Sequence, residues 1–551
     1  MNKAFYDELG TALDGRQVSE RELAKLKHDL CKKHGVTKPP TNIDILTRLP
    51  HLRLQTKPMR SQSGVTPIAV MTKPTRCPHG KCTYCPGGPG STFGDVPQSY
   101  TGNEPSTMRA IRNKYDPYLI VMNRLEQFIL LGHTPDKVEL IIQGGTFPAL
   151  DKEYQESVIE NCLKAMNDFG RALYDDRGFN HQRFQELFLL PADPRDAERE
   201  QQVQANLLTL KKQSTLEKEQ ERNEQAKIRC VGLTIETKPD WGLLTHGNEM
   251  LRLGCTRVEL GVQTVYDHVL QAVNRGHTMK ETYESFATLK DLGFKICAHV
   301  MPGLPNTSYD EDVEALKQQF KDTRLRPDLL KIYPCHVAPG TPLYYQWKKG
   351  DYNALKAKEA AHMIAAFKPH IPPYCRVQRV LRDVPTKFWA DGVEFTNLRQ
   401  YIHQHLKPPC KCIRCREPKT QQIDENAIQL NVLEYEASGG KEYFISLDDT
   451  TNDFIIGYCR LRVPQQSLRK EITKTSALIR ELHVNGSAVA IGNKGTIQHR
   501  GYGAQLLQKA EQIAHEQGRN KIVVISGIGV RRYYRKKGYE KDGPYMSKTL
   551  S

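Results

Sequence analysis

Three closely spaced cysteines stand out as residues that could carry chemistry: Cys77, Cys82 and Cys85, in a C-x4-C-x2-C pattern. Three thiolates on one loop can hold three irons of a [4Fe–4S] cluster. The fourth iron then stays open to a small molecule that chelates it through amino and carboxylate groups. S-adenosylmethionine fits this description, and one electron cleaves its C5′–S bond to a radical. The alternative is a zinc site completed by a residue such as His79.

A second cysteine group lies in a basic, Pro-rich segment and comprises Cys410, Cys412 and Cys415. Such closely spaced thiols suit tetrahedral zinc in a closed structural site. A fourth ligand is required, and the candidates are Cys375, His403 and His405. Cys375 is preferred because it would complete an all-thiolate site, and a second iron–sulfur cluster is the alternative.

A glycine turn near the C-terminus, at 498–503, precedes an amphipathic helix. Glycines let backbone N–H groups approach a pyrophosphate, and the helix N-terminus favours negative charge. Downstream, Tyr533 and Tyr534 are placed where a phenol could protonate a departing thiolate. The competing interpretation of these tyrosines is core packing.

Short apolar runs alternate with amphipathic stretches across the middle of the chain. The runs are 138–142, 230–235, 257–262, 294–300 and 329–333. Helix-prone stretches such as 278–292 separate most of them. This alternation is typical of a parallel β/α barrel, whose chemistry sits at the C-terminal strand ends. The charged stretch 193–229 interrupts it and is expected to be a surface insertion.

The last 130 residues change character to short alternating strands at 442–447, 454–463 and 477–484, a helix at 502–517 and a strand at 521–526. That pattern predicts a separate α+β domain. Near the N-terminus, 19–34 predicts a short basic helix. We therefore expect four parts: a basic N-terminal segment (1–75), a barrel (76–368), a zinc-stapled connector (369–420) and the α+β domain (421–551).

The composition favours a polyanionic partner. Lys and Arg total 79 against 63 Asp and Glu, a net charge of +16, and residues 45–94 contain no acid. Such a surface suits nucleic acid, although a solvated basic linker is the alternative. With 38% hydrophobic residues the chain can form cores, so wholesale disorder is excluded. No apolar run reaches 18 residues and no signal peptide is evident, so we expect a cytoplasmic protein without membrane contact.

Eight segments together resemble one family: 77–88, 99–117, 144–150, 232–240, 257–264, 480–484, 498–503 and 523–545. The chain resembles the catalytic subunit of Elongator, which joins a radical S-adenosylmethionine domain to a GNAT-type acetyltransferase domain. The resemblance is continuous from about residue 75 to the C-terminus and looser before it. It implies a partial TIM-type barrel followed by an α+β GNAT fold.

The activity that the resemblance implies is carboxymethyl-type modification of C5 of the wobble uridine, uridine 34, in tRNA. Acetyl-CoA is delivered from the GNAT domain into the barrel, where a 5′-deoxyadenosyl radical takes hydrogen from the acetyl methyl. The resulting carbon radical adds to C5, and water releases CoA. The implied cofactors are a [4Fe–4S] cluster, S-adenosylmethionine, acetyl-CoA and zinc.

The resemblance also implies roles for individual residues. The cluster ligands are Cys77, Cys82 and Cys85, and the zinc ligands are Cys375, Cys410, Cys412 and Cys415. The cofactor-binding positions are Lys137, Gln143, Gly144, Gly145, Glu481, Leu482, His483, Val484, Gln498, Gly501, Tyr502, Gly503, Ala504 and Tyr533. The candidate catalytic groups are Tyr533, Tyr534 and Glu481.

The partners implied are tRNA, tracked by the basic segments 48–81 and 368–419, and other Elongator subunits where these exist. The x4 cysteine spacing is shorter than in eukaryotic members, which indicates a bacterial or archaeal type able to act alone. The sequence does not separate a monomer from a homodimer. Two other functions stay open: a protein lysine acetyltransferase with Glu481 as base, and a non-catalytic RNA-binding scaffold.

Overall fold

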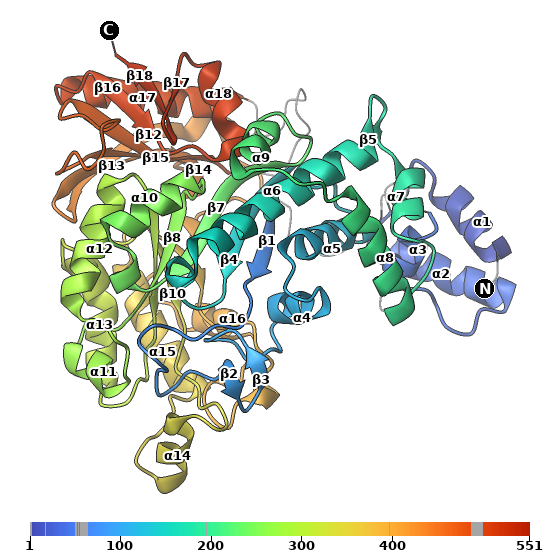
Figure 1. Ribbon diagram of the computed structural model, residues 1–551, viewed down its shortest axis with the longest axis horizontal. Coiled ribbons are helices and arrows are strands. Elements are labelled where there is room, and N and C mark those ends of the chain that lie inside the picture. The colour runs from blue at the N-terminus through green and yellow to red at the C-terminus, as the bar shows by residue number, and fades with distance from the viewer. Residues whose placement is uncertain are drawn as a thin grey trace.

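The computed structural model describes residues 3–16, 18–49, 52, 54, 64–193, 196–395, 397–419, 421–485 and 500–550. It consists of an N-terminal helical unit, a half-barrel and a C-terminal α+β domain (Figure 1). Within these ranges, no helix is long and apolar enough to cross a bilayer.

The half-barrel is a seven-stranded, all-parallel sheet of order β1-β4-β7-β8-β9-β10-β11. Its strands are β1 (Thr66–Met71), β4 (Lys137–Gln143), β7 (Arg229–Thr237), β8 (Arg257–Gln263), β9 (Lys295–Val300), β10 (Leu329–Ile332) and β11 (Arg376–Arg379). The predicted partial barrel is confirmed. The sheet begins before residue 76 and ends after residue 368, because β1 and β11 form its two edges.

Period-two alternation places successive side chains of a barrel strand on opposite faces of the sheet. In β4 the buried Val138, Leu140 and Ile142 face the outer helices, whereas Lys137, Glu139, Ile141 and Gln143 line the lumen. The same alternation in β8 and β9 places charged side chains inside the barrel. The barrel lumen is therefore polar, and the apolar core lies between sheet and helices.

The helices of this part of the chain are α4 (Pro105–Arg112), α5 (Pro117–Leu130), α6 (Lys152–Leu173), α7 (His181–Leu187), α8 (Ala197–Leu210), α9 (Leu216–Asn223), α10 (Leu244–Arg252), α11 (Asp267–Ala272), α12 (Met279–Asp291), α13 (Tyr309–Lys321), α14 (Pro342–Lys349), α15 (Ala357–Phe367) and α16 (Leu398–Gln404). Among them, α4, α5, α6 and α12 pack directly on strands of the sheet. Two small hairpins accompany them, β2 (Gly88–Ser91) with β3 (Gly94–Val96) and β5 (Tyr174–Asp175) with β6 (Gly178–Phe179). Helix α12 begins as the sequence predicts, because Thr278 and Glu281 form a capping box.

The expectation of a surface insertion at 193–229 is wrong for α9. This helix packs against α6, and Asn223 at its end is fully buried, with its side-chain amide bonded to Ile228 O at 3.1 Å. The next residue, Glu224, pairs with Arg531 at 3.1 Å and with Arg535 at 2.5 Å. The segment therefore connects the half-barrel to the C-terminal domain.

The C-terminal domain has a seven-stranded sheet of order β12-β13-β14-β15-β16-β18-β17. Its elements are β12 (Ile428–Ala437), β13 (Gly440–Asp449), β14 (Phe454–Val463), β15 (Ser476–Val484), α17 (Tyr502–Glu516), β16 (Lys521–Val524), α18 (Arg531–Arg535), β17 (Glu540–Asp542) and β18 (Tyr545–Thr549). The predicted strands and helix are present, and β12, β17 and β18 add to them. Helix α17 buries Leu506, Leu507 and Ala510 against the sheet.

Three buried arginines join this domain to the N-terminal ends of the barrel strands. Arg480 of β15 binds Asp328, just before β10, at 2.5 Å and donates to Phe294 O, just before β9, at 2.6 Å. Arg460 donates to Tyr374 O at 2.7 Å, just before β11. Arg462 pairs with Asp291 at 2.6 Å. The domain thus covers the end of the half-barrel opposite the C-terminal strand ends (Figure 1).

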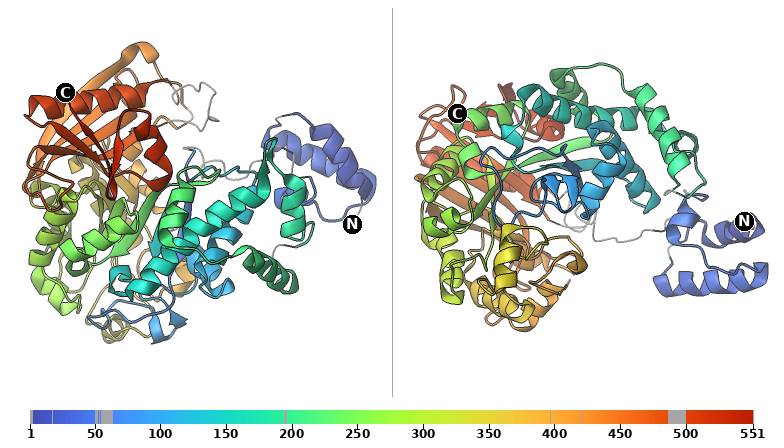
Figure 2. Two further views of the ribbon diagram at one scale, coloured as in Figure 1. Left: turned by 45° about the horizontal axis from the view of Figure 1, so that its top comes forward. Right: turned by 60° about the horizontal axis from the view of Figure 1, so that its bottom comes forward.

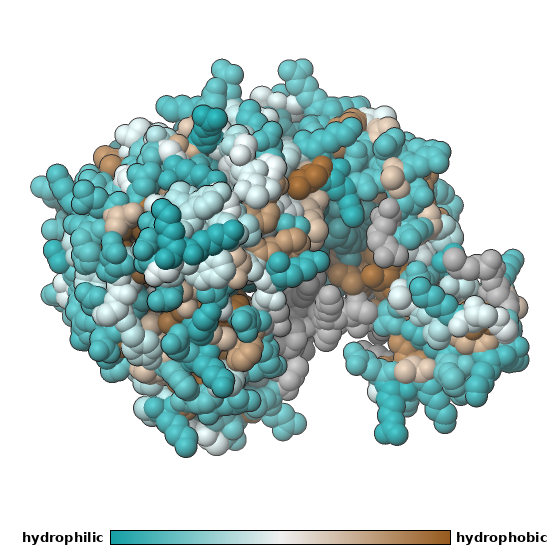
Figure 3. Space-filling model, turned by 90° about the horizontal axis from the view of Figure 1, so that it is seen from below, coloured by the Kyte–Doolittle hydropathy of each residue, from teal (hydrophilic) through white to brown (hydrophobic). Residues whose placement is uncertain are grey.

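The N-terminal unit contains α1 (Lys3–Leu13), α2 (Glu20–His34) and α3 (Asn42–Leu46) around its own small core. The predicted basic helix is α2, which buries Leu23 and Leu30. The unit lies to one side of the main body in each ribbon view (Figure 2). From below it is a separate, mainly hydrophilic lobe (Figure 3).

Candidate active site

One cavity of about 1650 Å³ connects the half-barrel with the C-terminal domain. The cluster loop lines one end of it with Cys77, Cys82 and Cys85, and β15 with the start of α17 lines the other. Between these ends lie the lumen-facing residues of β4, from Lys137 to Gln143. Six residues of a strand extend about 20 Å, so the cavity follows the full depth of the barrel.

Each thiol of the cluster loop has a polar neighbour. Cys77 Sγ lies 3.6 Å from Thr146 Oγ1, Cys82 Sγ lies 3.3 Å from His79 Nε2, and the Ser99 N–H donates to Cys85 Sγ at 3.2 Å. The Arg275 guanidinium also donates to Cys82 Sγ, at 3.6 Å. These donors favour thiolates, as a metal site requires.

The three sulfurs of this loop do not converge as ligands of a single ion do, whereas a cluster takes each thiolate on a different iron. Burial raises the pKa of Cys77 and, with Cys82 as a second cause, raises that of Cys85 to about 11. A bound cationic centre would displace those protons. The donor set and its spread therefore fit a [4Fe–4S] cluster better than zinc.

Two glycines after β4 allow close approaches, one to Thr72 at the end of β1 and one to the cluster loop. A Cβ on Gly144 would meet Thr72 Oγ1 at 1.9 Å, and one on Gly145 would meet Cys77 Sγ at 3.5 Å. Gln143 lines the cavity beside them and donates to Glu236 at 3.2 Å. Glu236 also accepts from Tyr100 Oη at 2.7 Å. Neither Tyr100 nor Glu236 was expected from the sequence, although 232–240 carried part of the resemblance.

The other end of the cavity is a wedge between two parallel strands. Pairing of β15 with β16 stops at Ile479 and Val524, so residues 481–484 diverge from β16. The first turn of α17 closes the wedge, with Gly501 in a left-handed conformation (φ 88°). Leu482, His483, Val484, Tyr502, Gly503 and Ala504 all line it. Such splayed strands beside a helix N-terminus suit a pyrophosphate-containing ligand. Gln498 lies outside the described residues.

The two candidate tyrosines have different surroundings. The Tyr533 phenol lies close to the start of α17, since a Cβ on Gly503 would be 3.3 Å from its Oη. Tyr534 also borders the cavity, but its ring packs in the core of the C-terminal domain, with only 5% of its surface exposed. Of the two phenols, Tyr533 is therefore the one placed to meet a ligand at the glycine turn.

Glu481 is held as a carboxylate by two cations. Arg460 Nε donates to it at 2.8 Å, and Lys295 lies 3.6 Å away. Burial alone would raise the pKa of Glu481, but Lys295 and Arg460 lower it to about 2. A carboxylate of such low pKa is a weak base at neutral pH, which disfavours the lysine-acetyltransferase alternative that relies on it.

We expect the ion pairs of Glu481 to stabilise the folded protein at neutral pH and to lose this effect in acid. The pKa of this carboxyl is about 2 in the folded protein instead of 4.5. The ionised group therefore adds about 3 kcal/mol to the free energy of unfolding above pH 4.5, and this contribution is lost as the pH falls towards 2. Melting temperatures of the wild type and Glu481→Gln should differ at pH 7 and converge towards pH 2.5. A gap that stays constant over this range would contradict the assignment.

Lys137 is the first residue of β4 and lines the cavity at the end nearest the C-terminal domain. From Lys137 towards the cluster loop, the lumen contains a set of charged side chains that were not predicted from the sequence. Arg257 binds Glu139 at 2.5 Å, Lys331 pairs with Glu259, and His299 lies 2.9 Å from Glu259. These lumen residues could have been predicted, because charged residues occur at alternate positions of the predicted strands.

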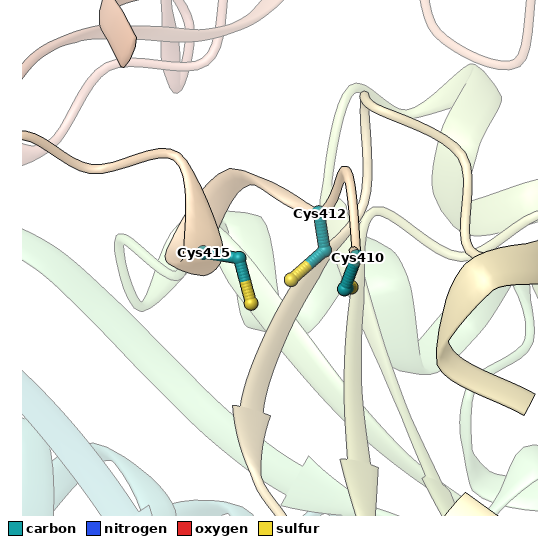
Figure 4. A group of neighbouring side chains, drawn as sticks. All are labelled: Cys410, Cys412 and Cys415. Atoms are coloured by element: carbon teal, nitrogen blue, oxygen red, sulfur yellow. The ribbon is translucent and has the colours of Figure 1, made fainter. Parts of the chain in front are cut away.

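The second cysteine group converges, because the sulfurs of Cys410, Cys412 and Cys415 lie within 4.8 Å of one another (Figure 4). Ligands of one tetrahedral zinc are about 3.8 Å apart, so these three fit that ion. The Lys368 ammonium lies 3.6 Å from Cys415 Sγ, which favours thiolates. The Cys375 carbonyl accepts from the Ile413 N–H at 3.0 Å, but its sulfur is not part of the converging group.

The open side of the half-barrel leads to the cavity. Among the described residues, β1 and β11 are edge strands that do not pair with each other. The cavity lining near these edges and the C-terminal domain is rich in basic residues: Arg109, Arg124, Arg379, Arg382, Lys419, Arg500, Arg532, Lys536 and Lys537. A polyanion is therefore favoured at this opening.

Three family models match the chain. The radical SAM superfamily matches residues 71–318, the radical SAM C-terminal domain 327–408 and the GNAT acetyltransferase family 403–539. These matches agree with the half-barrel and the C-terminal domain.

Characterised relatives match nearly the whole chain. It is 42% identical to tRNA uridine(34) acetyltransferase of Methanocaldococcus jannaschii, over 97% of this chain and 95% of that protein. It is 39% identical to human Elongator complex protein 3, over 97% and 94%. A solved structure of Methanocaldococcus infernus Elp3 with an N-terminal deletion superposes with a TM-score of 0.72 at 38% identity, covering 89% of this chain and all of that one. The chain therefore belongs to the Elongator complex protein 3 family of radical SAM and GNAT tRNA uridine(34) acetyltransferases.

Proposed function

We propose that the protein installs a carboxymethyl-type group on C5 of uridine 34 in tRNA, with acetyl-CoA as the carbon source. The observation that carries this proposal is the single cavity that joins the cluster loop to the glycine turn of the GNAT domain. A protein acetyltransferase would not need such a connection, and an RNA-binding scaffold would not need the cysteine loop. The relatives' names supply the substrate class.

Each end of the cavity has its own task in this proposal. Cys77, Cys82 and Cys85 would hold a [4Fe–4S] cluster, with Gln143, Gly144 and Gly145 beside its ligand. Such a cluster binds S-adenosylmethionine at its open iron and supplies the electron that makes a 5′-deoxyadenosyl radical. The wedge at 481–484 and 501–504 would hold acetyl-CoA, with Lys137 facing it across the barrel base.

The chain's own residues then position the two substrates. The basic opening binds the anticodon backbone, while the uracil must leave its stack to enter the lumen. In the lumen the acetyl methyl would lose a hydrogen atom to the 5′-deoxyadenosyl radical, and its carbon would then bond to C5 of the uracil. The adduct would lose the C5 proton to a base and one electron to the oxidised cluster, so that the C5–H bond is replaced by the C5–C bond. Water later releases CoA. Enclosure by the barrel limits side reactions of the radical.

The proposed function is tested by an anaerobic reaction of cluster-reconstituted protein with S-adenosylmethionine, a reductant, acetyl-CoA and tRNA carrying uridine 34. Nucleoside mass spectrometry should detect carboxymethyluridine that disappears when either cofactor is omitted. If no product forms while the cluster and tRNA binding are intact, the proposal is wrong, and acetylation of peptides becomes the activity to test.

Tyr533 is proposed as the phenol that contacts acetyl-CoA at the glycine turn. Removing its hydroxyl in Tyr533→Phe should lower product formation about 10- to 100-fold, because one hydrogen bond to a developing charge is lost. Tyr443→Phe is the matched control, since this tyrosine is buried in the core of the same domain and does not line the cavity. Equal losses in the two variants would contradict the assignment.

Zinc at Cys410, Cys412 and Cys415 is proposed as a structural site, with Cys375 as the fourth ligand. We expect about one zinc per chain by metal analysis and a fall below half of that in Cys412→Ser. Loss of the site should lower the melting temperature, because a metal that binds only the folded chain stabilises it. Unchanged zinc in Cys375→Ser would exclude this residue and favour His403 or His405.

A further inference from the structure

The lumen holds one cluster of reactive side chains that the proposed function has not used. Glu259 of β8 and Cys297 and His299 of β9 place their ligand atoms within 4.8 Å of one another. Glu259 and His299 line the cavity, whereas Cys297 is fully covered. His299 lies four residues beyond Lys295, the ion-pair partner of Glu481, and so about 13 Å deeper towards the cluster end.

The charges around this cluster argue against a metal. Lys331 Nζ and His299 Nε2 both contact the same oxygen of Glu259, Oε2. Arg257 lies 3.5 Å from the other oxygen. A divalent cation would meet two fixed positive charges here, the Lys331 ammonium and the Arg257 guanidinium. The arrangement instead suits proton transfer.

Glu259 is well suited to orient the imidazole. Its side chain is fully buried and anionic, because Lys331, His299 and Arg257 lower its pKa well below the usual range although burial alone would raise it. The carboxylate therefore accepts the Nε2–H of His299 at 2.9 Å. This leaves Nδ1 as the basic nitrogen, and among the described residues Nδ1 has no hydrogen-bond partner. A carboxylate-oriented imidazole with one free nitrogen is the arrangement of a general base.

We propose that His299, oriented by Glu259, is the general base that activates the water releasing CoA from the product thioester. Nδ1 accepts a proton from water as the C–O bond forms and the C–S bond breaks. The imidazolium then returns the proton to the CoA thiolate, so no electrons are exchanged. Glu259 is a positioning residue in this step. The inference rests on the proposed function, which makes a thioester on C5 of the uracil.

The test is a single-turnover anaerobic reaction with isotope-labelled acetyl-CoA, quenched in acid and analysed by mass spectrometry. In His299→Gln, 5′-deoxyadenosine should form as in the wild type. The CoA thioester of carboxymethyluridine should accumulate. The rate at which free carboxymethyluridine appears should fall by at least about 100-fold. His268→Gln, an exposed histidine on α11, is the matched control and should behave as wild type.

A second variant separates chemistry from folding. His299→Ala leaves room for a small base, so added imidazole should restore CoA release without changing the melting temperature. Release at the wild-type rate in His299→Gln, or loss of 5′-deoxyadenosine together with the product, would overturn the assignment. Absence of any modified nucleoside in the wild type would instead refute the proposed function, and the inference with it.

Discussion

Cys82→Ser is expected to abolish carboxymethyluridine formation, by at least about 1000-fold. The Cys82 sulfur contacts His79 of the cluster loop and Arg275, which follows α11. Without its thiolate, the proposed cluster loses one of its three protein ligands. Iron content should fall, and 5′-deoxyadenosine should disappear with the product. Iron analysis and nucleoside mass spectrometry measure both losses.

The control for this variant is Cys31→Ser, which removes a buried thiol of the N-terminal unit far from the cavity. Acetyl-CoA affinity should be unchanged in both variants, because the GNAT wedge lies at the opposite end of the barrel. Full product formation by Cys82→Ser would contradict the radical mechanism. If the wild type makes no carboxymethyluridine and peptides are acetylated by the wild type and by Cys82→Ser alike, the protein-acetyltransferase alternative is correct.

Arg480→Met is expected to destabilise the protein by about 3–5 kcal/mol, because it removes the guanidinium that pairs with two buried carboxylates, those of Asp328 and Glu442. Arg480 is fully buried and joins the base of β10 to the GNAT sheet. Its loss should also uncouple the two domains and lower product yield more than acetyl-CoA binding. Differential scanning calorimetry and limited proteolysis measure the two effects.

Two further variants make the Arg480 prediction specific. Asp328→Asn combined with Arg480→Met should cost less than the sum of the single changes, because the partners share one interaction. Arg252→Met removes an arginine that is 40% exposed and should cost about 1 kcal/mol or less. Additive losses, or an equal cost for Arg252→Met, would show that the buried network does not couple the domains.

The local structure could be predicted well from the sequence because it follows from local rules. The strand 454–463 has the bounds of β14, and α12 begins at its Thr278 capping box. Cysteine spacing predicted both groups, since a C-x4-C-x2-C loop and a C-x-C-x2-C loop each restrict their thiols to one small region. The radical SAM and GNAT domains were identified on such local motifs.

The edge strands β1 and β11 and the strand β12 were missed, because their short or exposed sequences carry little periodic signal. Helix α9 was placed on the surface because its residues are charged. Its buried Glu219 and Asn223 are satisfied by partners distant in sequence, such as Asn167. Such pairings exist only after the helices pack.

The sequence by itself determined which chemistry the chain carries: the cysteine loop, the glycine turn and the two domain types follow from residue type and spacing. Only the tertiary structure decided how these parts work together. The GNAT domain covers the N-terminal ends of the barrel strands through Arg460, Arg462 and Arg480, and one polar lumen connects both sites. The physical reason is that a buried ion-pair network and a continuous cavity arise from contacts between residues far apart in the chain, which no local pattern encodes.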